Sequence, residues 1–325
     1  MRFTLGVLSV VILLLTVTES RANVAMGKEL AKDQHVRDSV KFYVYTRQNR
    51  DVPQSLEANV ESVVRNVIDT TKPTTLFIPH MQSDFGSDEC NVIKDAKLQL
   101  EDGNVIVVDY SESITNSGDF ESIVSLMPHI AEAIGELVML LKHNFDFSLE
   151  HLHVVGFSLG GHISGITAQY LHQSLGQRIP RITALDPAGI YFTANTPSDQ
   201  RLSSDDAEFV EVVHTNAGQQ GFLSTCGHVD YYPNGGTLQP GCDEKDMACS
   251  HERAYQLIPE MWLPLENHEL LILKCPSLDY LGMDYCRWLS NKMGDLQQRP
   301  KDGVYYVETN SVKPYGKGAF LVEFF

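Results

Sequence analysis

One serine in the chain lies in a setting that suits a nucleophile. Residues 156–160 read Gly-Phe-Ser-Leu-Gly and place Ser158 between two glycines. A short β-branched run within residues 151–157 precedes it, and residues 163–171 after it carry apolar side chains at helical spacing. This order predicts a strand, a tight turn and a helix, with the backbone N–H of Leu159 facing any negative oxygen beside the serine. The glycines fit because such a turn brings other backbone too close for β-carbons. The chemistry indicated is attack by a serine hydroxyl.

A serine hydroxyl is a weak nucleophile at neutral pH, so it needs a base within reach and an acid that orients the base. Where the serine stands on a strand-to-helix turn, the three groups follow in the chain as serine, acid and histidine. The sequence offers Asp186, at the end of an apolar run, and then His251. His214 is a rival base because it also ends a predicted strand. Asp186 precedes a proline and would alternatively begin a turn.

The elements that must position these side chains alternate between strands and helices. The predicted strands cover residues 40–46, 74–78, 105–110, 151–157, 181–186, 209–214, 304–309 and 319–325, and the predicted helices cover 88–100 and 120–144, with a short amphipathic segment at 59–68. Pro128 should kink the longer helix or mark its first turn. This pattern predicts an α/β fold with a mostly parallel central sheet and helices on both faces. The catalytic groups should lie beyond the carboxyl ends of the strands.

Residues 1–22 predict a signal peptide. Arg2 gives a positive start, residues 5–15 are almost wholly apolar, and small residues stand at 20 and 22. We therefore expect a secreted protein with one α/β domain over residues 23–325 and no transmembrane segment. The formal net charge of −17 disfavours nucleic acids and strongly anionic membranes as partners.

The six cysteines predict disulfides, because an even count in an exported protein is typical of an oxidised framework. Two local pairs follow from spacing, Cys242 with Cys249 and Cys275 with Cys286. Elimination then leaves Cys90 with Cys226. A zinc site is disfavoured because no Cys-x-x-Cys pair occurs.

Several spaced motifs accompany the serine turn. They are Gly-Phe-Ser-Leu-Gly-Gly-His (156–162), Ala-Leu-Asp-Pro-Ala-Gly (184–189), Gly-His-Val-Asp-Tyr-Tyr-Pro-Asn-Gly-Gly (227–236), Gln-Pro-Gly-Cys (239–242) and Cys-Ser-His-Glu-Arg-Ala (249–254). With these motifs the chain resembles the pancreatic lipase family, and most of all its insect neutral-lipase and phospholipase A1 branch, over roughly residues 40–325. The resemblance implies an α/β-hydrolase fold in which Ser158 is the nucleophile, His251 the general base and Asp186 its orienter. It also favours His251 over His214, since His251 carries the Cys-x-His context of the family.

The resemblance also implies two oxyanion donors, the backbone N–H groups of Leu159 and of a residue after the strand at 74–78. The family has His-Gly followed by a bulky residue there, whereas this chain reads Pro-His-Met-Gln at 79–82. The second donor maps to Gln82, but Met81 replaces the glycine and is expected to alter the backbone path. Losing one such donor costs about 100- to 1000-fold in rate, so reduced or specialised activity is expected.

The segment between Cys242 and Cys249 corresponds to the lid of the family. Here it is the short, polar stretch Asp-Glu-Lys-Asp-Met-Ala at 243–248. By the resemblance, so small a lid goes with phospholipase A1 activity. The expected lack of a C-terminal lipid-binding β-sandwich favours phospholipids or dispersed esters over bulk triacylglycerol in the same way.

Residues 201–207 resemble the calcium loop of the family. The candidate ligands are Ser203, Asp205 and Asp206 with the carbonyl groups of Ser198 and Arg201, and the ion would stabilise the fold without taking part in the chemistry. A solvated acidic turn, or a cap on the next element, is the alternative. No cofactor is expected to be required for the reaction.

The sequence therefore predicts a secreted serine carboxyl-ester hydrolase that acts on lipids, a phospholipase A1 or neutral lipase. The alternative comes from another class of protein. Insect yolk proteins share this fold without catalysis and serve as storage or lipid- and hormone-binding proteins. They lack the triad, which this chain retains.

Overall fold

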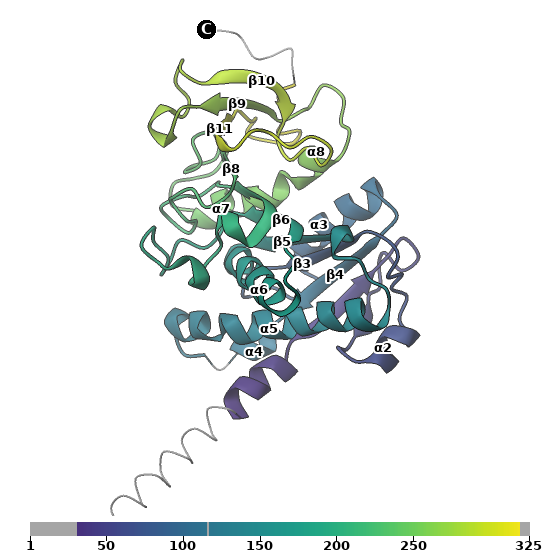
Figure 1. The fold of residues 1–325 in the computed structure, drawn as a ribbon. Helices are drawn as coiled ribbons and strands as arrows, with labels where there is room; N and C mark the ends of the chain where they lie inside the picture. Colours follow the sequence, from purple (N-terminus) through teal and green to yellow (C-terminus); the bar gives the residue numbers. More distant parts are fainter. Residues whose placement is uncertain (1–30, 116, 319–325) are drawn as a thin grey trace, which may run out of the picture.

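In the computed structural model, the described residues 31–115 and 117–318 are built around one sheet of eleven strands (Figure 1). The strands are β1 (Lys41–Tyr45), β2 (Gln54–Leu56), β3 (Thr74–Ile78), β4 (Asn104–Asp109), β5 (Leu152–Phe157), β6 (Ile179–Leu185), β7 (Ala207–Val213), β8 (Val229–Pro233), β9 (Leu271–Cys275), β10 (Arg287–Lys292) and β11 (Gly303–Val307). Their order across the sheet is β10-β9-β11-β8-β7-β6-β5-β3-β4-β1-β2.

Neighbouring strands from β4 through β3, β5, β6, β7 and β8 to β11 run parallel. The strands β1, β2, β9 and β10 pair antiparallel at the two edges. Every residue of β3, β4 and β5 is buried, as expected for parallel strands covered on both faces. Along β5, Val154 faces one apolar core and Val155 the other, so each face of the sheet has its own core. The mostly parallel α/β sheet predicted from the sequence is confirmed.

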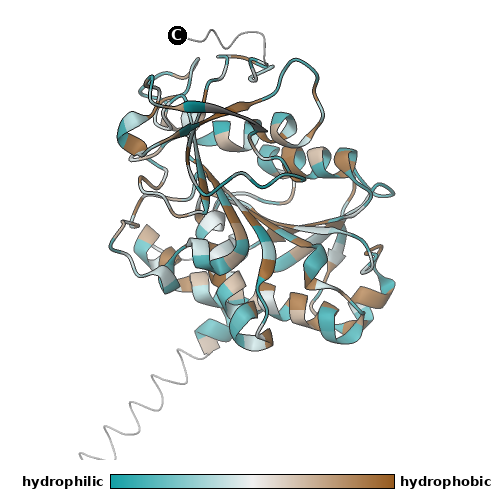
Figure 2. Cartoon of the chain, turned by 45° about the horizontal axis from the view of Figure 1, so that its top comes forward, coloured by the Kyte–Doolittle hydropathy of each residue, from teal (hydrophilic) through white to brown (hydrophobic). Residues whose placement is uncertain are grey.

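Helices cover both faces of this sheet. They are α2 (Val60–Arg65), α3 (Asp88–Leu100), α4 (Ser111–Ile114), α5 (Phe120–Asn144), α6 (Leu159–Leu175), α7 (Met247–Gln256) and α8 (Ile258–Trp262), with short 3₁₀ turns η1 (Leu149–His151), η2 (Ser198–Gln200), η3 (Ser204–Asp206) and η4 (Leu278–Tyr280). Helices α5 and α6 pack against one face, and α3, α7 and α8 against the other (Figure 1). In Figure 2 the central strands are rich in apolar residues, while the helices show mixed apolar and polar faces.

Helix α5 shows how a long apolar segment is used in this fold. Its N-terminus is capped by Asp119, whose side chain accepts a hydrogen bond from the backbone N–H of Ser122 at 2.8 Å. The helix continues through Pro128, which is therefore not in its first turn. Its length and composition would suit a membrane-crossing helix, but an apolar stripe that includes Ile130 and Leu137 is buried in the core beside α6.

Two disulfides are present, Cys242–Cys249 and Cys275–Cys286, as the local spacing predicted. The prediction that Cys90 pairs with Cys226 is wrong, because both thiols are free and buried. Cys90 belongs to the core on the α3 side of the sheet, and Cys226 belongs to the core on the opposite side. The sheet separates the two sulfurs, which elimination among cysteines cannot reveal.

Most buried elements match the sequence-based expectations, including both long helices with the same bounds. Strands β2, β8, β9 and β10 and helices α7 and α8 were not predicted from periodicity. The predicted signal peptide at 1–22 and the predicted strand at 319–325 lie outside the described residues.

Candidate active site

Ser158 occupies a strained turn between the end of β5 and the start of α6. Its φ is +55° and its ψ is −119°, a backbone conformation that costs a non-glycine residue about 1–3 kcal/mol. The flanking glycines are required by space, because a β-carbon at Gly156 would collide with the carbonyl of Gly160, and one at Gly160 with the carbonyl of Ile78. The backbone N–H of Ser158 also donates to Leu185 at 3.0 Å, so β6 helps to hold the turn.

Asp186 directly follows β6 and is completely buried. Its Oδ1 accepts hydrogen bonds from the backbone N–H groups of Thr215 at 2.9 Å and Asn216 at 3.1 Å. A glycine is required beside it, because a β-carbon at Gly221 would collide with the carboxyl group. Hydrogen bonds of this kind stabilise a buried carboxylate and fix its orientation. Its Oδ2 is left for a side-chain partner.

That partner is His251 on α7. Its Nδ1 lies 2.6 Å from Asp186 Oδ2, which leaves Nε2 as the nitrogen available to a nucleophile. The buried imidazole packs on the ring of Phe157, the residue before Ser158, with the ring centroids 4.8 Å apart. The disulfide Cys242–Cys249 and the Asp246 side chain, which accepts from the backbone N–H of Cys249 at 3.2 Å, hold the start of α7. The fold thus brings the acid and the base together next to the serine turn.

His214, the rival base, is bound on both sides of its ring. Its Nε2 is 2.9 Å from Asp230 Oδ1, and its Nδ1 is 3.0 Å from the carbonyl of Phe222. Tyr232 stacks on the fully buried imidazole at 4.3 Å between ring centroids. With both nitrogens engaged by acceptors, His214 has no site left to receive a serine proton. Its role is to fix the segment that contains Phe222.

The two expected oxyanion donors stand in suitable local structures. Leu159 is the first residue of α6, where backbone N–H groups point out of the helix. Gln82 lies in a turn closed by a 3.1 Å hydrogen bond from the backbone N–H of Ser83 to the carbonyl of His80. Met81 is not among the residues with positive φ, so this turn adopts no conformation reserved for glycine. The Met81 side chain is half-buried and packs on the apolar core of the α5 and α6 side.

Several oxygens of the expected calcium ligands already accept hydrogen bonds within the protein. The carbonyl groups of Ser198 and Arg201 and the Oδ1 of Asp206 all accept from the side-chain amide nitrogen of Gln169, at 3.0, 3.4 and 2.9 Å. Ser203 donates to the Asp206 carboxyl group through both its backbone N–H and its hydroxyl. Asp205 is exposed and outside this cluster. Calcium requires six to eight oxygens at about 2.3–2.6 Å, so the residues present do not fit it while the amide stands there.

Burial raises the pKa of Asp206 to about 7, against the hydrogen bonds from Ser203 and Gln169, which lower it. An amide donor suits such a carboxyl group, because it satisfies an oxygen in either protonation state. This local structure fits the alternative of a cap better, since Ser203 and Asp206 form a capping box around η3.

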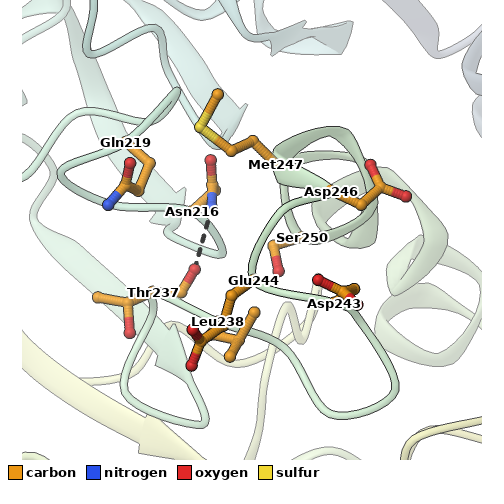
Figure 3. Close-up of a pocket in the computed structure, with 9 residues that line it drawn as sticks. All are labelled: Asn216, Gln219, Thr237, Leu238, Asp243, Glu244, Asp246, Met247 and Ser250. Carbon is orange, nitrogen blue, oxygen red and sulfur yellow. Dashed lines mark hydrogen bonds between the residues drawn. The ribbon is translucent and has the colours of Figure 1, made fainter.

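Two hollows are each lined by a residue that contacts Asp186, Asn216 in one and Gly221 in the other. One has a volume of about 340 Å³ and is lined by Asn216, Met247 and the carboxylates of Asp243 and Glu244 (Figure 3). The other, of about 370 Å³, is lined by residues that include Gly221, Phe222 and Leu223, and Gln219 lines both. The segment 243–248, which corresponds to the lid, is exposed throughout.

Some residues that support the site carried no recognisable sequence signal. The backbone donors of Thr215 and Asn216 are invisible in a residue pattern, since any residue type supplies an N–H. His162 is fully buried and bridges two loops, with Nε2 2.8 Å from the carbonyl of Ala188 and Nδ1 accepting from the backbone N–H of Leu202 at 3.2 Å. His162 belongs to the motif at 156–162, and the motif alone does not indicate this role.

The strand order, the strained serine turn and the acid–histidine pair define an α/β-hydrolase. A family model described as Lipase matches residues 16–315, and the chain belongs to the lipase family. It is 31% identical to human pancreatic lipase-related protein 3 and 36% identical to lipase member H-A of Xenopus laevis, covering 86% and 88% of this chain. The chain spans 65% of the length of each of these relatives. It is also 28% identical to phospholipase A1 of Polybia paulista, over 84% of this chain and 88% of that protein.

Proposed function

We propose that the protein is a lipid carboxyl-ester hydrolase that works through an acyl-enzyme on Ser158. The observation that carries this proposal is the 2.6 Å contact between His251 Nδ1 and Asp186 Oδ2, next to a serine held at positive φ. Membership of the lipase family supports the same reaction class.

In the proposed reaction, Ser158 Oγ attacks the ester carbonyl carbon while its proton passes to His251 Nε2. Asp186 holds the imidazole through Nδ1 and stabilises the imidazolium that forms. The negative oxygen of the tetrahedral intermediate accepts from the backbone N–H groups of Leu159 and Gln82. His251 then protonates the leaving alcohol as the carbon–oxygen bond breaks. Water repeats the sequence on the acyl-serine and releases the fatty acid.

The proposed substrate is a phospholipid, cleaved as by a phospholipase A1. The short lid is exposed and polar at most positions, so it cannot screen the site from dispersed lipid molecules. Exposed apolar side chains line the hollows, among them Leu223, Leu238 and Met247, and offer contact for acyl chains. The similarity to a wasp phospholipase A1 supports the same substrate class. Rates on phosphatidylcholine and on emulsified triolein, measured side by side, test it, and a preference for triolein would reject it.

Labelling with a fluorophosphonate probe, with Ser158→Ala as the control, tests the reaction class. A probe bound at Ser158 in the unsubstituted chain is the expected result. Failure to label would favour the alternative of a non-catalytic lipid- or hormone-binding protein. We also propose that the protein is extracellular, which the two disulfides support because such bonds persist in oxidising compartments.

A further inference from the structure

A second group of hydrogen-bonded side chains lies in the β3–α3 loop, outside the acid–histidine pair. The Nδ1 of His80 is 2.9 Å from the hydroxyl oxygen of Ser83, and Ser83 donates a short hydrogen bond to Glu89 Oε1 on α3. The His80 Nδ1 is also 3.8 Å from that carboxylate oxygen. Ser83 and Glu89 are buried, while His80 is partly exposed.

The direction of these hydrogen bonds follows from the number of protons. The Ser83 hydroxyl has one hydrogen and gives it to Glu89, so its oxygen accepts from His80 Nδ1–H. The His80 tautomer is thereby fixed. Burial pushes the pKa of Glu89 upward, but the nearby His80 and the hydrogen bond from Ser83 outweigh it and leave that pKa below its usual value. Glu89 is therefore a buried carboxylate, charged at neutral pH, whose side-chain partners are both in this loop.

The backbone that this network holds is the turn of residues 80–83. His80 and Ser83 are its two ends, joined by the 3.1 Å backbone hydrogen bond and by the contact between their side chains. The preceding residue is fixed too, because Tyr110 donates its hydroxyl hydrogen to the carbonyl of Pro79 at 2.8 Å. The corner residues of the turn, Met81 and Gln82, are the two between these fixed ends.

The turn also lies beside the nucleophile. Strands β3 and β5 are parallel neighbours with Ile78 opposite Gly156, so the turn follows one strand end and Ser158 the next. The start of α6 packs so closely on the carbonyls of Ile78 and Pro79 that only a glycine fits at 160. In folds of this kind a backbone N–H from the loop after this strand completes the oxyanion hole.

We propose that Glu89, Ser83 and His80 form a positioning network that fixes the backbone N–H of Gln82 as the second oxyanion donor. The inference rests on the proposed function, because it concerns the same reaction. It also accounts for Met81, since a turn held at both ends by side chains does not depend on a glycine for its path. A buried carboxylate is costly unless it is paired, so a charge placed beneath this partly exposed turn points to a requirement for the turn to be rigid.

The test compares four full-length variants with the unsubstituted chain on p-nitrophenyl butyrate. Ser83→Ala breaks the network, Ser83→Thr restores a hydroxyl, and Glu89→Gln removes the charge while keeping the shape. Ser87→Ala is the matched control, because Ser87 is in the same loop but its hydroxyl donates to the carbonyl of Asp84 at 2.9 Å and lies beside the thiol of Cys90. Measurements are kcat, KM, the melting temperature, and hydrogen exchange of the Gln82 amide.

For Ser83→Ala we expect kcat to fall about 10- to 100-fold, while KM stays within about twofold of the unsubstituted value. This loss in kcat is smaller than the loss caused by removing an oxyanion donor completely. The Gln82 amide should exchange faster in Ser83→Ala, and Glu89→Gln should lose about tenfold in kcat. Ser83→Thr and Ser87→Ala should stay within about threefold of the unsubstituted chain. If Ser83→Ala does not fold, the kcat of Glu89→Gln tests the inference instead.

A Ser83→Ala variant with unchanged kcat, or losses in Ser83→Ala and Ser87→Ala that both follow melting temperature, would overturn the inference and leave the hydrolase intact. Absence of hydrolysis and of fluorophosphonate labelling in the unsubstituted chain would overturn the proposed function and the inference with it.

Discussion

Asp186 and His251 are 65 residues apart in the chain, yet Oδ2 of the one lies 2.6 Å from Nδ1 of the other. The contact depends on three separate elements. Strand β6 ends at the acid, helix α7 carries the base, and the backbone of Thr215 and Asn216 holds the second carboxylate oxygen. Because the pair is buried, the imidazole has one fixed orientation, in which it would receive the serine proton in the proposed reaction.

Asp186→Asn should therefore lower kcat about 10⁴-fold, because an amide that faces Nδ1 favours the wrong tautomer of His251. The Asn side chain can still accept from the two backbone donors through its oxygen, so the fold should be retained. Steady-state kinetics together with a melting curve measure this. Activity within tenfold of the unsubstituted chain would show that Asp186 does not orient the base.

Ser158→Gly should raise the free energy of unfolding by about 1 kcal/mol while it abolishes hydrolysis, since glycine adopts positive φ without the strain that serine carries. Urea unfolding of the two proteins measures the gain. Ser158→Ala is the control, because it removes the hydroxyl group and keeps the strain. Equal stability of the glycine and alanine variants would contradict a strained turn.

His162 should make the fold sensitive to acid. Burial lowers the pKa of this imidazole to about 4 from an ordinary value of 6.5, against the hydrogen bond to Ala188 and with a smaller contribution from Arg201. A depressed pKa means that the unfolded chain binds the proton first. The contribution of His162 to the free energy of unfolding is therefore complete above pH 6.5. As the pH falls towards 4, this contribution is lost, by about 3 kcal/mol in all.

Urea unfolding at pH 7 and pH 4.5 measures this dependence. In His162→Gln, where the amide keeps a donor and an acceptor without titrating, the difference between the two pH values should shrink. If the two proteins lose the same free energy of unfolding between pH 7 and pH 4.5, other groups cause the acid sensitivity.

Gln169 should make the loop at 198–206 independent of calcium. We expect the melting temperature of the unsubstituted chain to be the same in calcium and in chelator. Gln169→Ala should lower the free energy of unfolding by about 1–3 kcal/mol, because two carbonyls and a carboxyl oxygen lose their shared donor. Those oxygens should then respond to calcium with a rise in melting temperature.

The matched control is Gln173→Ala, an exposed glutamine on the same helix. A calcium-dependent rise in the melting temperature of the unsubstituted chain would show that the amide gives way to the ion, and would restore the calcium loop that the resemblance implied.

Local sequence patterns predicted the parts of the structure that local physics decides. The small residues around Ser158 indicated a turn that the close approach of Gly160 to Ile78 requires. Fully buried strands such as β3 and β4 were predicted because strands covered on both faces read as apolar runs. The position of Asp186 at a strand end followed from the same reasoning, and the choice of His251 rested on the resemblance.

Contacts between distant side chains were beyond the sequence. Nothing in residue order places Gln169 among the oxygens of the loop at 198–206, or Glu89 beneath Ser83. The mistaken pairing of Cys90 with Cys226 has the same cause, since the face of the sheet on which a helix packs decides which sulfurs can meet. Edge strand β9 was missed because its buried and half-exposed residues do not alternate regularly.

The segment 243–248 has one more consequence, for protein engineering. Its ends are joined by the disulfide Cys242–Cys249, with the α-carbons 5.6 Å apart, and its residues are all exposed. It is therefore a loop whose two ends are held in place by the disulfide. A longer or more apolar loop grafted at residues 243–245, with Asp246 kept as the cap of α7, should change which lipids are admitted, while His251 stays where the native chain places it.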